Sequence, residues 1–197
     1  MATQTGHLKL TYEDYRLIPD DGKRHELIDG DHVMSPSPTT KHQRIARALL
    51  TALTNFLRDH PLGEVFIAPY DVVLSDFDVV QPDLVFVTTA QADIVTEANI
   101  RGTPTLVVEI LSEGNRKLDE TIKRQRYEHY GIPEYWIIDP ALDQIKIYRL
   151  TEGRYGQASV LSLEANDLLT TPLLPNLSLP LATLFTSSSP QQPTPPK

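Results

Sequence analysis

The chain has 197 residues, of which 40% are hydrophobic and 22% charged, a length and composition that suit one globular domain. Eighteen Lys and Arg against 26 Asp and Glu give a formal charge of -8, which disfavours a protein that coats nucleic acid through general charge attraction. The lack of cysteine excludes disulfides, thiolate zinc sites, iron–sulfur clusters and a cysteine nucleophile. Any metal must be held by Asp, Glu, His or carbonyl oxygen, which favours magnesium or manganese.

The two ends of the chain are interpreted from their composition. Residues 1–10 lack the apolar run of a secretory signal, and no stretch approaches the ~20 apolar residues of a membrane span. We therefore expect a cytoplasmic protein that does not enter a membrane. The last twelve residues are rich in Ser, Pro and Gln and cannot build a core, so we expect one domain over 1–185 and a disordered tail over 186–197.

The first expected elements are a short helix, a hairpin and a long helix. Residues 11–17 open with a Thr and carry an Asp three positions later, the pattern of a capping box. Residues 25–28 and 32–34 flank Asp29-Gly30-Asp31, the strongest hairpin signal in the chain. From position 39 or 40 to 58, apolar residues recur at i, i+3 and i+4, which predicts an amphipathic helix.

A series of short strands and one further helix follows. Strands rich in β-branched residues are expected at 65–68, 72–74, 84–87, 105–111 and 135–138. Strand 105–111 is almost wholly apolar, which is typical of a strand covered on both faces. A helix over 118–130 would join it to 135–138 as a parallel crossover. Strands 144–150 and 155–160 should be antiparallel and peripheral, and 168–185 irregular. The expected fold is α/β (α+β), with a central mixed sheet flanked by helices.

Two acidic residues lie in strands that should be buried. Glu109 shares a face of strand 105–111 with apolar residues, so its charge must be neutralised by a proton, a cation or a metal ion. The alternative is a core Glu paired with an Arg or reaching solvent at the strand's end. Asp83 follows Pro82 at the start of another strand, although Pro-Asp is also common turn chemistry. Two carboxylates that meet at one end of a sheet would form an oxygen-rich site suited to magnesium.

Lys123 is the third candidate. If its helix begins near Asp119, Lys123 lies about 6 Å along the axis and its side chain tilts back toward the helix start. The ammonium could then reach Glu109, where it would orient a water or stabilise charge on a phosphate, which favours Lys123 over Lys117. The alternative is a solvated helix Lys.

This triplet resembles the PD-(D/E)XK, or restriction-endonuclease-like, superfamily. Pro82-Asp83 matches the PD of the motif and Glu109 its second acidic residue, but position 111 holds Leu rather than Lys. Members with a migrated lysine draw it from the following helix, which fits Lys123. The resemblance implies a core in the order αβββαβ and a metal ion held by Asp83, Glu109 and the backbone carbonyl of Ile110.

A longer string of motifs resembles the putative restriction endonuclease family of that superfamily, a widespread bacterial group. It covers residues 12–148 in order. Its pieces are Glu26-Leu27-Ile28-Asp29-Gly30, Ser35-Pro36, His42, Gln81-Pro82-Asp83, Val108-Glu109-Ile110-Leu111-Ser112, Lys123 with Tyr127, and Gly131-Ile132-Pro133-Glu134-Tyr135-Trp136. The family's usual Ser-Pro-Ser after the glutamate strand is Ser112-Glu113-Gly114 here. The resemblance implies a nuclease site more firmly than it implies a known substrate.

Three supporting residues follow from the same resemblance. Glu26 matches the early acidic residue, which would ligate metal or position water; the alternative is an exposed carboxylate on a hairpin. His42 would contact a phosphate or the carboxylates, or else be an ordinary surface or packing residue. Tyr127 lies one turn beyond Lys123 and would orient it or pack in the core.

The charge of -8 is an objection to nucleic-acid binding that local clusters of cations could answer. Three cations lie on the long helix, and five lie between residues 116 and 126, where acidic neighbours dilute them. The two groups are Lys41, Arg44 and Arg47, and Arg116, Lys117, Lys123, Arg124 and Arg126.

We therefore expect a magnesium- or manganese-dependent endonuclease that hydrolyses phosphodiester bonds, with DNA as its partner. A homodimer is expected because enzymes that cut both strands commonly act as dimers, and strands after Gln144 could pair across a two-fold axis. The first alternative is a non-catalytic binding or regulatory module that keeps the fold. The second is a glycosidase, but its sugar cleft needs aromatic residues, and the single Trp, Trp136, lies in a core-like strand.

Overall fold

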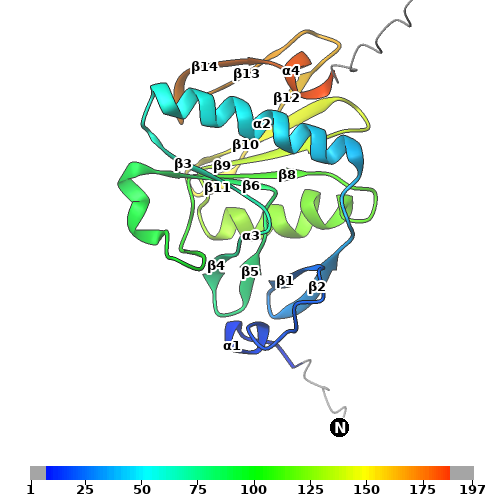
Figure 1. Cartoon of the computed structure of the whole chain (residues 1–197), viewed down its shortest axis with the longest axis vertical. Helices are drawn as coiled ribbons and strands as arrows, with labels where there is room; N and C mark the ends of the chain where they lie inside the picture. Colours follow the sequence, from blue (N-terminus) through cyan, green and yellow to red (C-terminus); the bar gives the residue numbers. More distant parts are fainter. Residues whose placement is uncertain (1–7, 187–197) are drawn as a thin grey trace, which may run out of the picture.

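A computed structural model describes residues 8–186, and its largest feature is a sheet of seven strands (Figure 1). These strands are β3 (Gly63–Ile67), β6 (Leu84–Thr88), β8 (Leu106–Ile110), β9 (Glu134–Asp139), β10 (Gln144–Thr151), β11 (Arg154–Tyr155) and β12 (Ser159–Ser162). The order is β11–β10–β9–β8–β6–β3, with β12 also paired to β10. Strands β8 and β9 run parallel, and the other pairs run antiparallel. The expected mixed sheet is confirmed.

A smaller sheet carries the predicted hairpin. Its strands, in the order β2–β1–β5–β4–β7, are β1 (Arg24–Ile28), β2 (Asp31–Ser35), β4 (Val72–Ser75), β5 (Asp78–Val80) and β7 (Ile100–Arg101). Asp29 and Gly30 both have positive φ, 52° and 80°, the turn geometry that matches the twist of a two-residue hairpin. The capping box before α1 (Tyr12–Tyr15) is also present. Strands β5 and β7 were not predicted, since three and two residues are too short to show a period.

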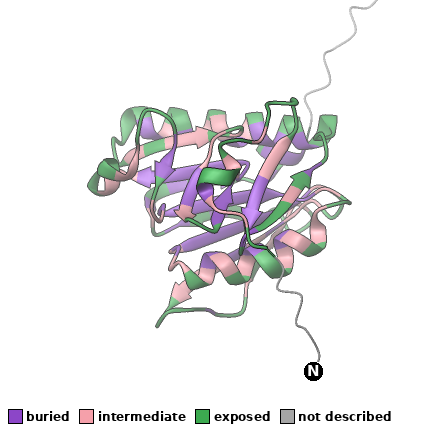
Figure 2. Cartoon of the chain, turned by 90° about the horizontal axis from the view of Figure 1, so that it is seen from below, coloured by how far each residue is buried: buried purple, intermediate pink, exposed green. Residues whose placement is uncertain are grey.

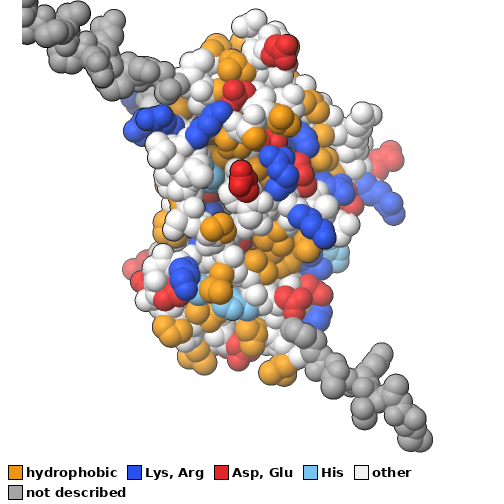
Figure 3. All heavy atoms as spheres, turned by 90° about the vertical axis from the view of Figure 1, so that its right-hand side faces the viewer, with side chains coloured by type: hydrophobic (Ala, Val, Ile, Leu, Met, Phe, Trp, Pro, Cys, Tyr) orange, Lys and Arg blue, Asp and Glu red, His pale blue; other side chains and the backbone are white. Residues whose placement is uncertain are grey.

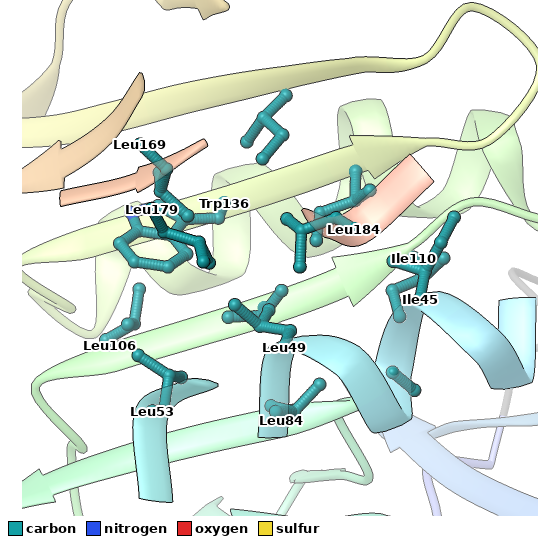
Figure 4. Close-up of a cluster of buried hydrophobic side chains, with 14 of the residues drawn as sticks. Ile45, Leu49, Leu53, Leu84, Leu106, Ile110, Trp136, Leu169, Leu179 and Leu184 are labelled. Carbon is teal, nitrogen blue, oxygen red and sulfur yellow. The ribbon is translucent and has the colours of Figure 1, made fainter. Parts of the chain in front are cut away.

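Helices cover both faces of the large sheet. Helix α2 (Thr40–Asp59), close to its predicted bounds, presents Ile45, Leu49 and Leu53 to one face of the sheet (Figure 4). On the other face lies a helix that begins as a π-helical segment, η2 (Leu118–Lys123), and continues as α3 (Arg124–His129). Figure 2 shows that the sheet between these helices is mostly buried. The predicted helix 118–130 is therefore present, but its first half is wound more widely than an α-helix.

The C-terminal region corrects one prediction. Residues 168–185, expected to be irregular, form a hairpin of β13 (Leu168–Thr171) and β14 (Leu174–Pro180), followed by α4 (Ala182–Phe185). Leu169, Leu179 and Leu184 join the core on the side of α2 (Figure 4). Three prolines interrupt this stretch and hide the alternation of buried leucines, which explains why the strands were missed.

Other expectations need smaller corrections. The expected strand 155–160 is two short strands, and β10 is not peripheral, because its Ile145 and Ile147 are buried. A 3-10 helix, η1 (Thr89–Ile94), follows β6. None of the helices in the described residues has the length and apolarity needed to cross a bilayer. Of the predicted tail 186–197, only Thr186 belongs to the described residues, so the prediction of disorder lies outside them.

Candidate active site

The fold brings Asp83 and Glu109 to the same level of two neighbouring strands. Asp83 directly precedes β6, Glu109 lies in β8, and Leu84 of β6 is paired with Val108 of β8. The backbone N–H of Ile110 donates a 2.7 Å hydrogen bond to Asp83 Oδ2. Asp83 is 3% exposed and Glu109 2% exposed. Two carboxylates are therefore held inside the protein, side by side, by the pairing of an antiparallel ladder.

Lys123 completes the group from the last residue of η2. Its Nζ donates to Glu109 Oε1 at 2.9 Å and to Glu26 Oε1 at 2.8 Å, and it lies 3.6 Å from Asp119 Oδ1. The side chain is buried, whereas Lys117 is exposed. A single ammonium thus lies among three carboxylates that come from β1, β8 and η2.

Glu26 and Tyr127 hold this arrangement from two sides. Glu26 is fully buried in β1 and accepts a 2.8 Å hydrogen bond from the backbone N–H of Gln81. Tyr127, one turn after Lys123 in α3, donates through its hydroxyl to Glu109 Oε1 at 2.8 Å. Glu26 is therefore no exposed hairpin carboxylate, and Tyr127 both packs in the core and contacts the acidic group.

Asp83 is surrounded by a second set of donors. His42 Nε2, near the start of α2, lies 3.1 Å from Asp83 Oδ2, and Arg24 Nη1 donates to Asp83 Oδ1 at 2.9 Å. Burial acts to raise the pKa of Asp83, but His42, Arg24 and the N–H of Ile110 outweigh it and lower the pKa below its usual value. Asp83 is therefore kept ionised in the interior.

The other carboxylates are less well compensated. Burial, helped by the neighbouring carboxylates, raises the pKa of Glu109 to about 8 against the attraction of Lys123. Burial likewise raises the pKa of Asp119 to about 6. Burial alone would lower the pKa of Lys123, but the surrounding acids raise it well above its usual value. Four acidic side chains thus face two full cations, Lys123 and Arg24.

Arg24 and Asp119 are site residues that the sequence interpretation did not find. Arg24 lies two residues before Glu26 in β1, so the period of 2 places both on one face of the strand. Asp119 lies four residues before Lys123 and forms an i,i+4 pair with it. Both spacings were visible in the sequence, but they gain meaning only once Glu26 and Lys123 are known to face the site.

A small cavity of about 20 Å³ lies among these side chains. It has room for one ion or one water, and Asp119 Oδ1 is buried beside it without a hydrogen-bond partner. Within residues 8–186, no group of three or more His, Asp or Glu side chains is placed so that it could hold a metal ion as it stands. The types of donor are nevertheless those that a hard divalent cation prefers: carboxylate oxygens in excess of cations, with an Asp119 oxygen that accepts no hydrogen bond.

The predicted clusters of cations serve mainly other purposes. Arg116 forms two hydrogen bonds with Asp139, Arg126 pairs with Asp78, and Lys41 pairs with Asp143. Lys and Arg side chains are interspersed with Asp and Glu on the face shown in Figure 3. At these three positions, the cations of the sequence clusters are therefore paired with acids of the protein itself.

Trp136 bears on the glycosidase alternative. Its side chain is fully buried in β9, where its indole N–H donates to Glu134 Oε2 at 2.8 Å. It packs in the core on the α2 side of the sheet. The one Trp of the sequence is thus unavailable as a platform for a sugar ring, as the objection raised from the sequence had expected.

Comparisons with known proteins bear on the family and the fold. A family model described as putative restriction endonuclease (Uma2) matches residues 12–182. The crystal structure of a putative nuclease belonging to DUF820 from Anabaena variabilis superposes with a TM-score of 0.75 at 20% identity, covering 89% of this chain and 97% of that chain. The type IIG restriction endonuclease BpuSI gives a TM-score of 0.40 at 16% identity, covering 66% of this chain and 15% of that chain. Among curated proteins, no match to this chain was found.

Proposed function

This chain belongs to the putative restriction endonuclease family, and from that premise we propose that it is a divalent-metal-dependent endonuclease that hydrolyses phosphodiester bonds in DNA. One observation carries the proposal: Asp83 and Glu109 lie at one cavity, with the Nζ of Lys123 2.9 Å from Glu109. Two acids and a lysine from adjacent elements are the groups that metal-assisted phosphodiester hydrolysis uses. Buried ion pairs that serve only stability do not need a surplus of acids.

We assign Asp83, Glu109 and the backbone carbonyl of Ile110 as the residues that would hold the metal ion. Bound there, magnesium or manganese supplies neutralisation of phosphate charge and a more acidic water. The protein contributes a fixed, ionised Asp83, because the Ile110 N–H, His42 and Arg24 all bond to it in advance. Such preorganisation spares the site from rearranging its dipoles during the reaction.

Lys123 is assigned to the attacking water or to the charge that develops on the phosphate. Its ammonium is fixed by Glu26 and Glu109, while the hydroxyl of Tyr127 fixes Glu109 in turn. Glu26 acts as a positioning residue in this scheme, since it accepts hydrogen bonds from Lys123, the backbone of Gln81 and the hydroxyl of Ser35. The high pKa of Lys123 means that it acts as a cation and not as a base at neutral pH.

Plasmid cleavage tests this proposal. Supercoiled plasmid and single-stranded oligonucleotides are incubated with Mg²⁺ or Mn²⁺ and the parent, Asp83→Asn and Glu109→Gln proteins. We expect cleavage by the parent and a loss of at least about 10³-fold in both variants, which corresponds to about 4 kcal/mol of barrier. Asp93→Asn, an exposed acid in η1, is the matched control and should cleave like the parent. Equal cleavage by the parent and either site variant would contradict the mechanism.

A non-catalytic binding or regulatory module is the second candidate, and one observation favours it. Asp83 and Glu109 already bond to protein donors, and the cavity between them is small. In that case Lys123 and Arg24 would be permanent partners of the acids. The parent protein would then bind nucleic acid or a protein partner without cleaving any substrate in either metal.

A further inference from the structure

Arg24 lies between two hollows of the protein surface. The carboxylate cavity of about 20 Å³ and a groove of about 640 Å³ share four lining residues. These are Arg24, Ser35, Pro36 and Pro38. Arg24 alone among the four carries a charge. Any ligand that passes from the groove toward Asp83 and Glu109 therefore passes a guanidinium.

The two hollows differ in size and therefore in what each can hold. The cavity has room for an ion or a water, and its acids are at most 3% exposed, so a phosphodiester cannot enter it whole. The groove lies within the range of volumes typical of ligand sites, roughly 300–1,000 Å³. A nucleic-acid strand would lie in the groove, and its reacting phosphate would stop at the shared rim.

The guanidinium of Arg24 retains donors for such a phosphate. Its Nη1 donates to Asp83 Oδ1 at 2.9 Å and, more weakly, to the carbonyl of Gln81 at 3.4 Å. Across residues 8–186, its Nε and Nη2 form no hydrogen bond. The side chain is 23% exposed, and a guanidinium fork matches two phosphate oxygens in one plane.

Other groove residues provide a polar path of mixed charge. Lys23, whose side chain is 60% exposed, adds a second cation next to Arg24 and contacts Asp21 at 3.1 Å. Ser37 and Gln43 line the groove with uncharged polar groups, and Asp20 is its acidic residue. The excess of cation over acid is thus small and is concentrated beside the carboxylate cavity.

We propose that Arg24 binds the reacting phosphate of a nucleic-acid strand that lies in this groove. This inference rests on the proposed function and names a substrate contact for it. The Nη1 of Arg24 neutralises Asp83, while its Nε and Nη2 are the donors that would bind the phosphate. The guanidinium would therefore keep an anionic partner with and without substrate, and would not be left buried and unpaired.

The test measures binding without cleavage. A fluorescent 20-mer, single-stranded or duplex, is titrated with parent, Arg24→Gln and Arg24→Lys proteins in Ca²⁺ at several salt concentrations. We expect Arg24→Gln to weaken binding about tenfold and to reduce the slope of log K against log salt by about 1, the signature of one lost phosphate contact. Arg24→Lys keeps the charge and should retain the slope. Arg154→Gln, an exposed arginine on the edge strand β11, should match the parent.

Mn²⁺ binding in the absence of nucleic acid separates this role from a purely structural one. If Arg24 contacts phosphate, Arg24→Gln binds Mn²⁺ at least as tightly as the parent, because Asp83 loses a competing cation. A weaker Mn²⁺ affinity together with an unchanged salt slope would overturn the inference and make Arg24 a positioning residue for Asp83. Failure of the parent to bind either oligonucleotide would also overturn it.

The outcome remains distinct from that of the proposed function. The Arg24 contact would be supported and the nuclease contradicted if the parent binds the oligonucleotide but cleaves nothing, and if Arg24→Gln reduces the slope of log K against log salt. A parent that cleaves, with an Arg24→Gln slope equal to its own, would support the nuclease and contradict the Arg24 contact.

Discussion

Two buried acidic regions of this protein, one around Asp78 and one around Glu109, differ in the ratio of carboxylates to cations. Around Asp78 in β5, one carboxylate is matched by one guanidinium: Arg126 Nε donates at 2.9 Å, and Arg126 Nη2 makes a second contact. The hydroxyl of Tyr130 donates at 2.7 Å and the backbone N–H of Asp29 at 3.0 Å. Burial acts to raise the pKa of Asp78, but these donors outweigh it and lower the pKa. This pair joins the small sheet to α3.

Around Glu109, by contrast, carboxylates outnumber cations. Four carboxylates share Lys123 and Arg24, and the pKa of Glu109 rises to about 8. Asp119 Oδ1 and His42 Nδ1 are buried without hydrogen-bond partners among the described residues. The difference teaches that charge balance, and not burial alone, separates an ion pair that serves stability from one that serves a ligand. The following changes test this difference, from the largest expected effect on stability to the smallest.

The largest effect should come from removing the cation that the acidic group shares. Lys123→Met leaves Glu26 and Glu109 buried without their ammonium, which should lower the free energy of unfolding by about 3–5 kcal/mol. Urea denaturation followed by circular dichroism at neutral pH measures this loss. The matched control is Lys117→Met, an exposed lysine, which should stay within about 0.5 kcal/mol of the parent. A loss below about 1 kcal/mol in Lys123→Met would show that the acids do not depend on the ammonium.

An intermediate effect is expected at the balanced pair. Arg126→Met leaves Asp78 without its guanidinium and should cost about 2–4 kcal/mol. Because the pKa of Asp78 is lowered in the folded state, its contribution is present above pH 4 and is lost as the pH falls through the lowered value. The difference between parent and variant, measured by urea denaturation, should therefore shrink as the pH is lowered below the ordinary Asp pKa. The variant's Mn²⁺ affinity should equal that of the parent, and a loss of Mn²⁺ binding would contradict the separation of the two regions.

The smallest effect has the opposite sign. The pKa of Glu109 is about 8 in the folded protein against an ordinary value of 4.5, so the folded state binds the extra proton between these values. The parent's free energy of unfolding should therefore fall as the pH rises from about 5 to 8, whereas Glu109→Gln lacks this contribution. We expect Glu109→Gln to be more stable than the parent by about 1–2 kcal/mol near pH 8.5 and by less near pH 5. Urea denaturation at both values checks this, and a less stable variant at pH 8.5 would contradict the surplus of acidic charge.

Much of the fold and part of the site could be predicted from the sequence because their signals are local. A long run of apolar residues with a period of 3.6 predicted α2, and the Asp29-Gly30 turn predicted the hairpin. The meeting of Asp83 and Glu109 follows from two strands that begin and end near the same edge. Lys123 could be reached by a distance argument along a helix.

The remainder depends on contacts between segments distant in sequence. That Arg24 faces Asp83 across 59 positions depends on how the hairpin packs against the large sheet, which no local period encodes. The use of Arg116 and Arg126 in ion pairs with Asp139 and Asp78 likewise appears only in three dimensions. Short strands such as β5 have too few residues for a pattern and owe their conformation to their neighbours.

Mn²⁺ binding tests most directly the claim that the surplus of acids around Glu109 is a divalent-metal site. Isothermal titration calorimetry is carried out on the parent, Asp83→Asn, Glu109→Gln and the exposed control Asp93→Asn at pH 8. We predict one site in the parent and in Asp93→Asn, weakened at least about tenfold in each of the two site variants. No binding by the parent at millimolar Mn²⁺, or the same affinity in all four proteins, would contradict the claim.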